Sequence, residues 1–290
     1  MVKGFLYKVF CGFFLGISVF APGFSGSIVA IIMGIYEDLI RIISNPFKQL
    51  KQNIVFCIPL AIGVAVSAVL FIIAFKYLFD TYEKATYMLF IGLIAGNLPV
   101  IWAEVKKCGF KKHYLAGGGC AFAAAIALGF FASGIGILPD AESVTSSLSL
   151  LALGGLAGGV MALVPGMSVS MILIIIGVYS QVIYIADMLL HLNFAYLLHF
   201  AVFCLCAVVG LVAASSGIKA VLARFPGFAN SVVFGFVAGS LIGVLIQSAR
   251  LEDADFNWLT GGIMLAAGLG LSVLFVFVGR AVKKTSSEER

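Results

Sequence analysis

The chain has 290 residues, of which 62% are hydrophobic and only 11% are charged, whereas soluble domains carry roughly 25% charged residues. Its mean hydropathy is +1.15, so it has too few charged side chains to cover the surface of a soluble protein. The net charge of +5 does not indicate a nucleic-acid partner, because the charges stand in short clusters between long apolar runs. We therefore predict an all-α polytopic membrane protein.

Uncharged runs of about 20 residues, the length that crosses the hydrocarbon core as a helix, predict the membrane-spanning helices. In the first half of the chain we expect these helices at about 54–75, 85–103 and 114–138. In the second half we expect them at about 192–218, 228–249 and 256–279.

Two further uncharged runs are interrupted by Pro-Gly. The run 9–36 has 28 residues and is broken at Pro22-Gly23, so it is too short for two crossings and carries a helix breaker where one crossing needs none. We predict a re-entrant helical hairpin at about 5–36. The run 143–186 has 44 residues around Pro165-Gly166. We predict a second hairpin at about 148–186, although this length also admits two full crossings.

The two broken runs resemble each other at a constant offset of 143 residues. Eight of the 15 positions in 22–36 are identical to their counterparts in 165–179. Glycine pairs spaced four residues apart recur at the same offset: Gly12 and Gly16 with Gly155 and Gly159, and Gly92 and Gly96 with Gly235 and Gly239. The chain therefore divides into repeats 1–143 and 144–290, each with one hairpin and three crossings.

The distribution of Lys and Arg predicts the orientation. With both termini in the cytoplasm, 15 of these residues lie inside and only Lys76, Lys84 and Arg250 lie outside. Because each repeat crosses the membrane an odd number of times, the second repeat is inverted relative to the first. Inverted-topology repeats are the architecture of many secondary transporters, and they bring the two hairpin tips toward the membrane centre from opposite faces.

Each Pro-Gly break precedes serines at the expected start of a helix. The first N–H groups of such a helix lack intrahelical partners, the helix dipole adds partial positive charge, and a phosphate is a natural occupant. Alternatively, the glycines form a turn and the serines cap the helix; two copies at matched depth favour the phosphate site. The candidate phosphate-binding residues are Gly23, Ser25, Gly26 and Ser27 in the first tip, and Gly166, Ser168 and Ser170 in the second.

The first tip, Ala-Pro-Gly-Phe-Ser-Gly-Ser at 21–27, and the Gly-Ile-Tyr-Glu at 34–37 resemble the bacterial polyprenyl-phosphate translocase family (PopT type). The glycine-rich stretch 92–99 is also similar to that family. The resemblance implies a transporter that returns undecaprenyl phosphate, the lipid carrier of envelope glycan synthesis, from the outer to the inner leaflet of the bacterial cytoplasmic membrane. The second tip departs from the pattern, with Val169 in place of Gly26 and Ser180 in place of Glu37, which leaves open whether it binds ligand.

Glu37 and Arg41 follow the first hairpin. They are either a coupling acid and a partner of the headgroup, or residues of a solvated helix end. A transporter or channel for a small anion is the alternative function. An intramembrane lipid-modifying enzyme is disfavoured, because no nucleophile stands at an evident spacing from a base. The three histidines have no metal-ligand spacing, so we expect neither a metal nor a cofactor.

Overall fold

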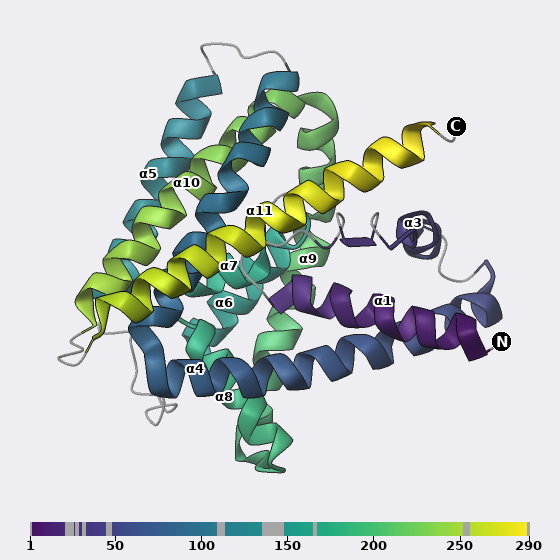
Figure 1. The fold of residues 1–290 in the computed structure, drawn as a ribbon, viewed down its shortest axis with the longest axis horizontal. Coiled ribbons are helices and arrows are strands. Elements are labelled where there is room, and N and C mark those ends of the chain that lie inside the picture. Colours follow the sequence, from purple (N-terminus) through teal and green to yellow (C-terminus); the bar gives the residue numbers. More distant parts are fainter. Residues whose placement is uncertain are drawn as a thin grey trace.

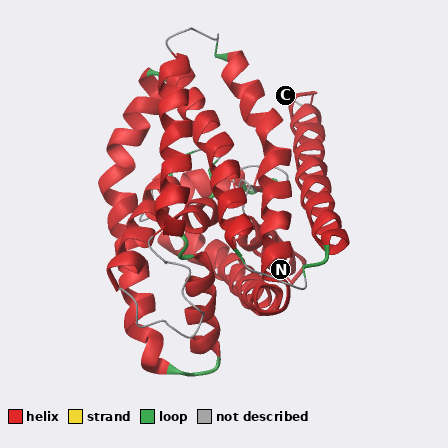
Figure 2. Ribbon diagram, turned by 90° about the vertical axis from the view of Figure 1, so that its left-hand side faces the viewer, coloured by secondary structure: helices red, strands yellow, loops and turns green. Residues whose placement is uncertain are grey.

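The computed structural model describes residues 2–20, 26, 29–30, 33–44, 48–108, 114–134, 148–164, 167–251 and 256–288. Within these ranges the regular structure is helical and contains no strand, as predicted (Figure 2). The helices of the first half are α1 (Val2–Phe20), α3 (Tyr36–Ser44), α4 (Leu50–Lys107) and α5 (Tyr114–Gly134). Those of the second half are α6 (Leu148–Met161), α7 (Val169–Ile176), α8 (Tyr179–Leu190), the short 3₁₀ helix η1 (Phe194–Tyr196), α9 (Leu197–Arg224), α10 (Pro226–Arg250) and α11 (Trp258–Glu288).

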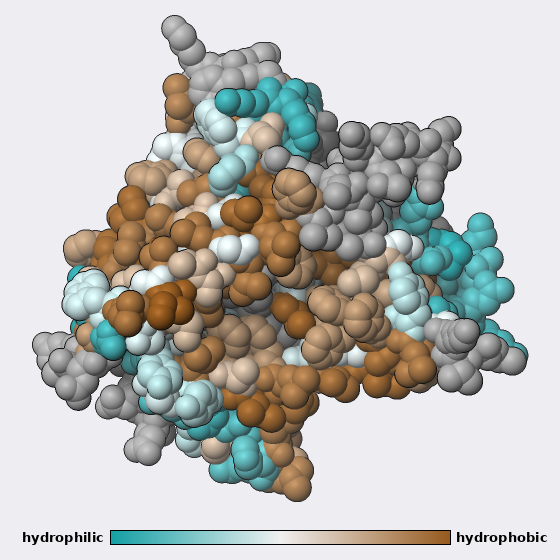
Figure 3. Space-filling view, viewed as in Figure 1, coloured by the Kyte–Doolittle hydropathy of each residue, from teal (hydrophilic) through white to brown (hydrophobic). Residues whose placement is uncertain are grey.

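Four helical segments in the described part of the chain are long and apolar enough to cross a membrane: Leu50–Lys107, Phe194–Ala214, Pro226–Arg250 and Trp258–Phe277. They coincide with the predicted crossings, and α5 covers the one expected at 114–138 as far as residue 134. Residues 135–138 lie outside the described part. Apolar side chains spread over much of the face seen in Figure 3, as a hydrocarbon environment requires.

Helix α4 differs from the sequence prediction, which placed two separate helices at 54–75 and 85–103. It runs for 58 residues and bends at Tyr82, whose φ of −138° and ψ of 49° are not helical. The helix continues through 76–84 because this stretch has no Gly or Pro. The Thr86 hydroxyl donates to the carbonyls of Tyr82 (2.9 Å) and Leu78 (3.1 Å), which satisfies groups freed at the bend. We call residues 50–81 the first arm and 83–107 the second arm; Figure 1 shows them diverging.

The helices pack in pairs along the glycine stripes. Helix α1 lies on the first arm of α4, α6 on α9, α11 on the second arm of α4, and α10 on α5 (Figure 1). A Cβ added at Gly12 would overlap the carbonyl of Leu60, and one added at Gly155 would overlap the carbonyl of Phe203. Both residues of the second contact follow those of the first by 143, so equivalent helix contacts recur at the offset found in the sequence. The inversion of the two halves stays a prediction.

Helix α7 lies at the centre of the molecule. Its residues 170–176 are all buried, and it packs against α1, α5, α6 and α10. Its eight residues span roughly 12 Å, less than half of a hydrocarbon core of about 30 Å. Helix α8 leaves it at an angle of 109°. The sequence predicted a hairpin of two arms at 148–186, and the structure has three segments there, because Gly177 ends α7 with a φ of 84°.

Candidate phosphate site at two helix breaks

The first tip is described only at Gly26; Gly23, Ser25 and Ser27 lie outside the described residues. Gly26 faces the first helix of its own hairpin. A Cβ added there would stand 3.3 Å from Ser18 Oγ and 4.0 Å from Leu15 Cδ2. The Ser18 hydroxyl already donates to the Leu15 carbonyl at 2.6 Å. A side chain at position 26 would therefore point toward the first helix of the hairpin.

The second tip is described at Ser168 and Ser170, while Gly166 lies outside the described residues. Ser168 is the N-cap of α7, with extended backbone (φ −114°, ψ 140°) and no capping hydrogen bond from its side chain. The two hydroxyls lie 2.7 Å apart and hydrogen-bond to each other, and both residues are buried. The structure thus places two hydroxyls at the buried, electropositive start of a helix, where the first N–H groups have no intrahelical acceptor.

The departure of the second tip at Val169 has a packing explanation. A Cβ added at Gly158 would stand 3.0 Å from Val169 Cγ1. Gly158 and Val169 are the repeat counterparts of Leu15 and Gly26, so the large and the small residue have changed places across the hairpin. The volume at this contact is kept in both repeats. The offset of 143 shows both substitutions in the sequence, but only the structure shows that the two positions face each other.

The second helix of each hairpin ends in the same way. Gly34 and Gly177 have left-handed backbone, with φ of 64° and 84°, a common helix ending. The next residue in each repeat then donates its N–H five residues back, Ile35 to Ala30 and Val178 to Leu173, both at 3.0 Å. In the second repeat the buried Gln247 of α10 also donates to the Ile175 carbonyl at 2.9 Å. The sequence analysis missed Gln247, whose only signal was a lone amide at the end of an apolar run.

Glu37 and Arg41 lie on α3 and are both exposed. Arg41 forms an ion pair with Asp38 at 2.9 Å, and their side chains are 54% and 42% exposed. Glu37 and Asp38 occupy the first turn of the helix, where acidic side chains are stabilised by the helix dipole. This geometry is that of a solvated helix end.

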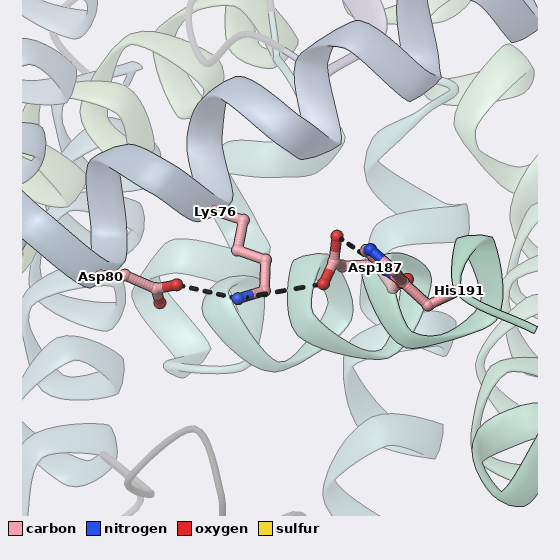
Figure 4. A network of polar contacts seen from close by, with 4 residues as sticks. All are labelled: Lys76, Asp80, Asp187 and His191. Atoms are coloured by element: carbon pink, nitrogen blue, oxygen red, sulfur yellow. Dashed lines mark hydrogen bonds and ion pairs between the residues drawn. The ribbon is translucent and has the colours of Figure 1, made fainter. Parts of the chain in front are cut away.

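A polar network that the sequence analysis did not predict joins α4 to α8 (Figure 4). Lys76 lies between Asp80, at 2.8 Å, and Asp187, at 3.9 Å. His191 Nδ1 lies 3.6 Å from Asp187 Oδ1 and 3.0 Å from the Asp187 carbonyl. The Asp187 side chain is 3% exposed, so Lys76 supplies the nearby charge that a buried carboxylate needs. The network ties the second hairpin to the first arm of α4.

In the described part of the chain, no three His, Cys, Asp or Glu side chains gather as a metal site would require. The buried polar side chains of the described residues are serines, Thr86, asparagine and glutamine amides, and the single carboxylate of Asp187. Uncharged hydrogen-bond donors at a helix start suit an anion better than a cation.

Comparison with known proteins adds to this geometry. The model of a family described as VCA0040-like, undecaprenyl phosphate translocase-like, matches residues 15–257. The chain belongs to this undecaprenyl phosphate translocase-like family. The matched range includes both tips and extends through α10, so the family resemblance drawn from the first tip is confirmed.

Two relatives in the translocase-like family have curated names. A polyprenyl-phosphate transporter of Staphylococcus aureus is 30% identical over 240 residues, covering 80% of this chain and 83% of the relative. A polyprenyl-phosphate transporter of Vibrio cholerae is 28% identical over 253 residues, covering 81% of this chain and 74% of the relative. No solved structure matches the chain.

Proposed function

We propose that this chain transports undecaprenyl phosphate from the outer to the inner leaflet of the bacterial cytoplasmic membrane, as a transporter and not as an enzyme. Membership of the translocase-like family is the observation that carries the proposal. The geometry adds a place for the headgroup, because α7 begins inside the protein with Ser168 and Ser170 at its electropositive end. An anionic headgroup is costly to bring into hydrocarbon without such donors.

The proposal includes two inverted repeats with both termini in the cytoplasm. Contacts between distant segments support this arrangement, because they join segments that the charges place on one side. Lys84 Nζ donates to the Leu251 carbonyl at 3.3 Å, and both residues are predicted to lie outside. Asn230 Nδ2 donates to Cys108 Sγ at 3.4 Å; Cys108 is predicted to lie inside, and Asn230 near the inner end of the crossing at 228–249. The short buried α7 supports a re-entrant second hairpin, because it is too short to cross the membrane.

Leaflet exchange in liposomes tests the proposal. The purified protein is reconstituted with undecaprenyl phosphate that carries a fluorophore at the far end of its chain, and a membrane-impermeant quencher removes the signal of the outer leaflet. We expect quenching to proceed beyond the outer-leaflet fraction only with protein present. A labelled phosphatidylcholine serves as the control substrate. Exchange of undecaprenyl phosphate no faster than in protein-free liposomes would refute the function.

A further inference from the structure

An apolar cavity of about 440 Å³ adjoins the second tip, within the size range of small-molecule sites. It is bounded by α6 at Val160 and Met161, by α9 at Ala214 and Ile218, and by α10 at Val233. Met167, which directly precedes Ser168, also lines it. Every residue that lines the cavity is apolar, so a free inorganic anion would lose its hydration there without compensation.

The cavity leads from the surface into the protein between α9 and α10. Val221 and Phe228 at its outer end are 45% and 38% exposed, whereas Val233 and Phe236 at its inner end are 4% and 7% exposed. Space remains between these helices because α9 packs mainly on α6 and α10 mainly on α5 and α4. The outer end lies where α9 ends and α10 begins, at the predicted inner boundary of the membrane, and the rest of the cavity extends between the two helices.

The same space is filled in the first repeat. The counterparts of Ala214, Ile218 and Val233 at the offset of 143 are Phe71, Phe75 and Phe90. Phe71 and Phe75 stack with ring centroids 3.9 Å apart, and Phe75 and Phe90 stack at 5.5 Å. Phe90 is 0% exposed. At these three positions the open crevice of the second repeat has smaller side chains than the filled one of the first, whereas Phe228 and Phe236 are larger than their counterparts Ala85 and Leu93.

We propose that this cavity holds the first part of the isoprenoid chain of the polyprenyl phosphate, with the rest leaving between α9 and α10 into the bilayer. This inference rests on the proposed function and extends it to a second subsite. The cavity touches the residue before the serine tip, so a chain lying in it places a terminal phosphate toward the start of α7. Two methionines line it, and their flexible side chains adapt to an irregular branched chain.

The test exchanges the cavity residues for their counterparts in the first repeat. Ala214→Phe with Val233→Phe fills the space with side chains that the same fold accommodates at positions 71 and 90. Val208→Phe is the matched control, because Val208 lies on α9 at 59% exposure and does not line the cavity. Each variant is reconstituted with labelled undecaprenyl phosphate, and thermal unfolding in detergent checks its fold. If the double variant fails to fold, Ala214→Leu replaces it.

We expect the double variant to slow exchange of undecaprenyl phosphate by about tenfold or more, since excluding even two methylene groups from an apolar site costs about one factor of ten. Val208→Phe should exchange like the parent. Binding of geranyl phosphate, whose two isoprene units are the part of the chain assigned to the cavity, should weaken as well. Unchanged exchange in a folded double variant would overturn the cavity proposal while the proposed function stands.

A photoreactive neutral polyprenol decides the cavity proposal independently of transport. We expect it to crosslink to α9 or α10 in the parent and in Val208→Phe, and to lose this crosslink in the double variant. A tenfold excess of phospholipid that abolishes the crosslink would show a general site for membrane acyl chains and overturn the proposal. If the parent exchanges no undecaprenyl phosphate, the proposed function fails, and the polyprenol result still decides whether the cavity binds isoprenoid chains.

Discussion

The two halves of the chain share their hairpin packing but differ in the crevice beside it. In the first half the space between the arms of α4 is filled by stacked phenylalanines, and in the second half the space between α9 and α10 is open. The glycine contacts that hold the helices together recur in both halves. The helix arrangement depends on glycines at the helix contacts, whereas the internal space depends on the side chains that line the crevice. If the halves are inverted, the filled and the open crevice lie toward opposite sides of the membrane.

Opening the filled crevice should have the largest effect. Phe71→Ala introduces the residue that the second repeat has at position 214, and we expect it to lower the free energy of unfolding by about 3–5 kcal/mol, the usual cost of Phe→Ala in a core. Phe277→Ala, at an exposed position (74%), is the control and should change it by less than about 0.5 kcal/mol. Unfolding midpoints in detergent measure both. Equal stability of the two variants would mean that the phenylalanine stack does not hold the first crevice closed.

Exchanging the hairpin pair tests whether the two hairpins are equivalent. Gly26→Val alone should destabilise the protein by about 1–3 kcal/mol through overpacking against Ser18 and Leu15, and Leu15→Gly alone should leave a cavity. The double variant reproduces the pair Gly158 and Val169, so the single effects should compensate by at least about 1 kcal/mol. The reciprocal exchange, Gly158→Leu with Val169→Gly, serves as the matched control. Strictly additive effects in both repeats would show that these positions do not correspond.

Serine substitutions compare the two tips as phosphate sites. Ser25→Ala should weaken binding of undecaprenyl phosphate about ten- to a hundredfold, because a hydrogen bond to a charged group contributes about 1.5–3 kcal/mol. Ser168→Ala should weaken it less, since the hydroxyls of the second tip bond to each other. The exposed Ser149→Ala is the control. Binding is measured by quenching with the labelled lipid, and parent-like affinity of Ser25→Ala would make the first tip a structural turn.

The smallest effect is expected on α3. Arg41→Gln breaks the exposed ion pair with Asp38 and should change the free energy of unfolding by less than about 1 kcal/mol. Lys107→Gln, which breaks a similarly exposed pair with Glu104, is the matched control. Both should exchange lipid like the parent if α3 is a solvated helix end. Loss of exchange in Arg41→Gln alone, at unchanged stability, would assign Arg41 to the headgroup path.

Much of the architecture can be derived from the sequence because a membrane-spanning helix requires a long uncharged run of residues. A helix that crosses hydrocarbon must be long and apolar, so the runs at 192–218, 228–249 and 256–279 coincide with helices in the structure. The offset of 143 also predicted which glycines would lie at equivalent helix contacts, because a close backbone approach tolerates no side chain. The continuity of α4 and its bend at Tyr82 were not predicted; the lack of Gly and Pro in 76–84 was the available signal that no loop separates the two crossings.

The sequence by itself determined the membrane class, the repeat and the composition of the two tips, because each depends on residue type along one segment. Only the tertiary structure decided what those residues contact. In the sequence, Val169 is a departure from the pattern of the first tip, and the structure explains it by the contact with Gly158. Ala214, Ile218 and Val233 were ordinary apolar residues until α9 and α10 were seen to leave a space between them. The side-chain volume at a contact between two helices depends on which faces of the helices meet. The periodicity of one helix carries no information about the helix that packs against it.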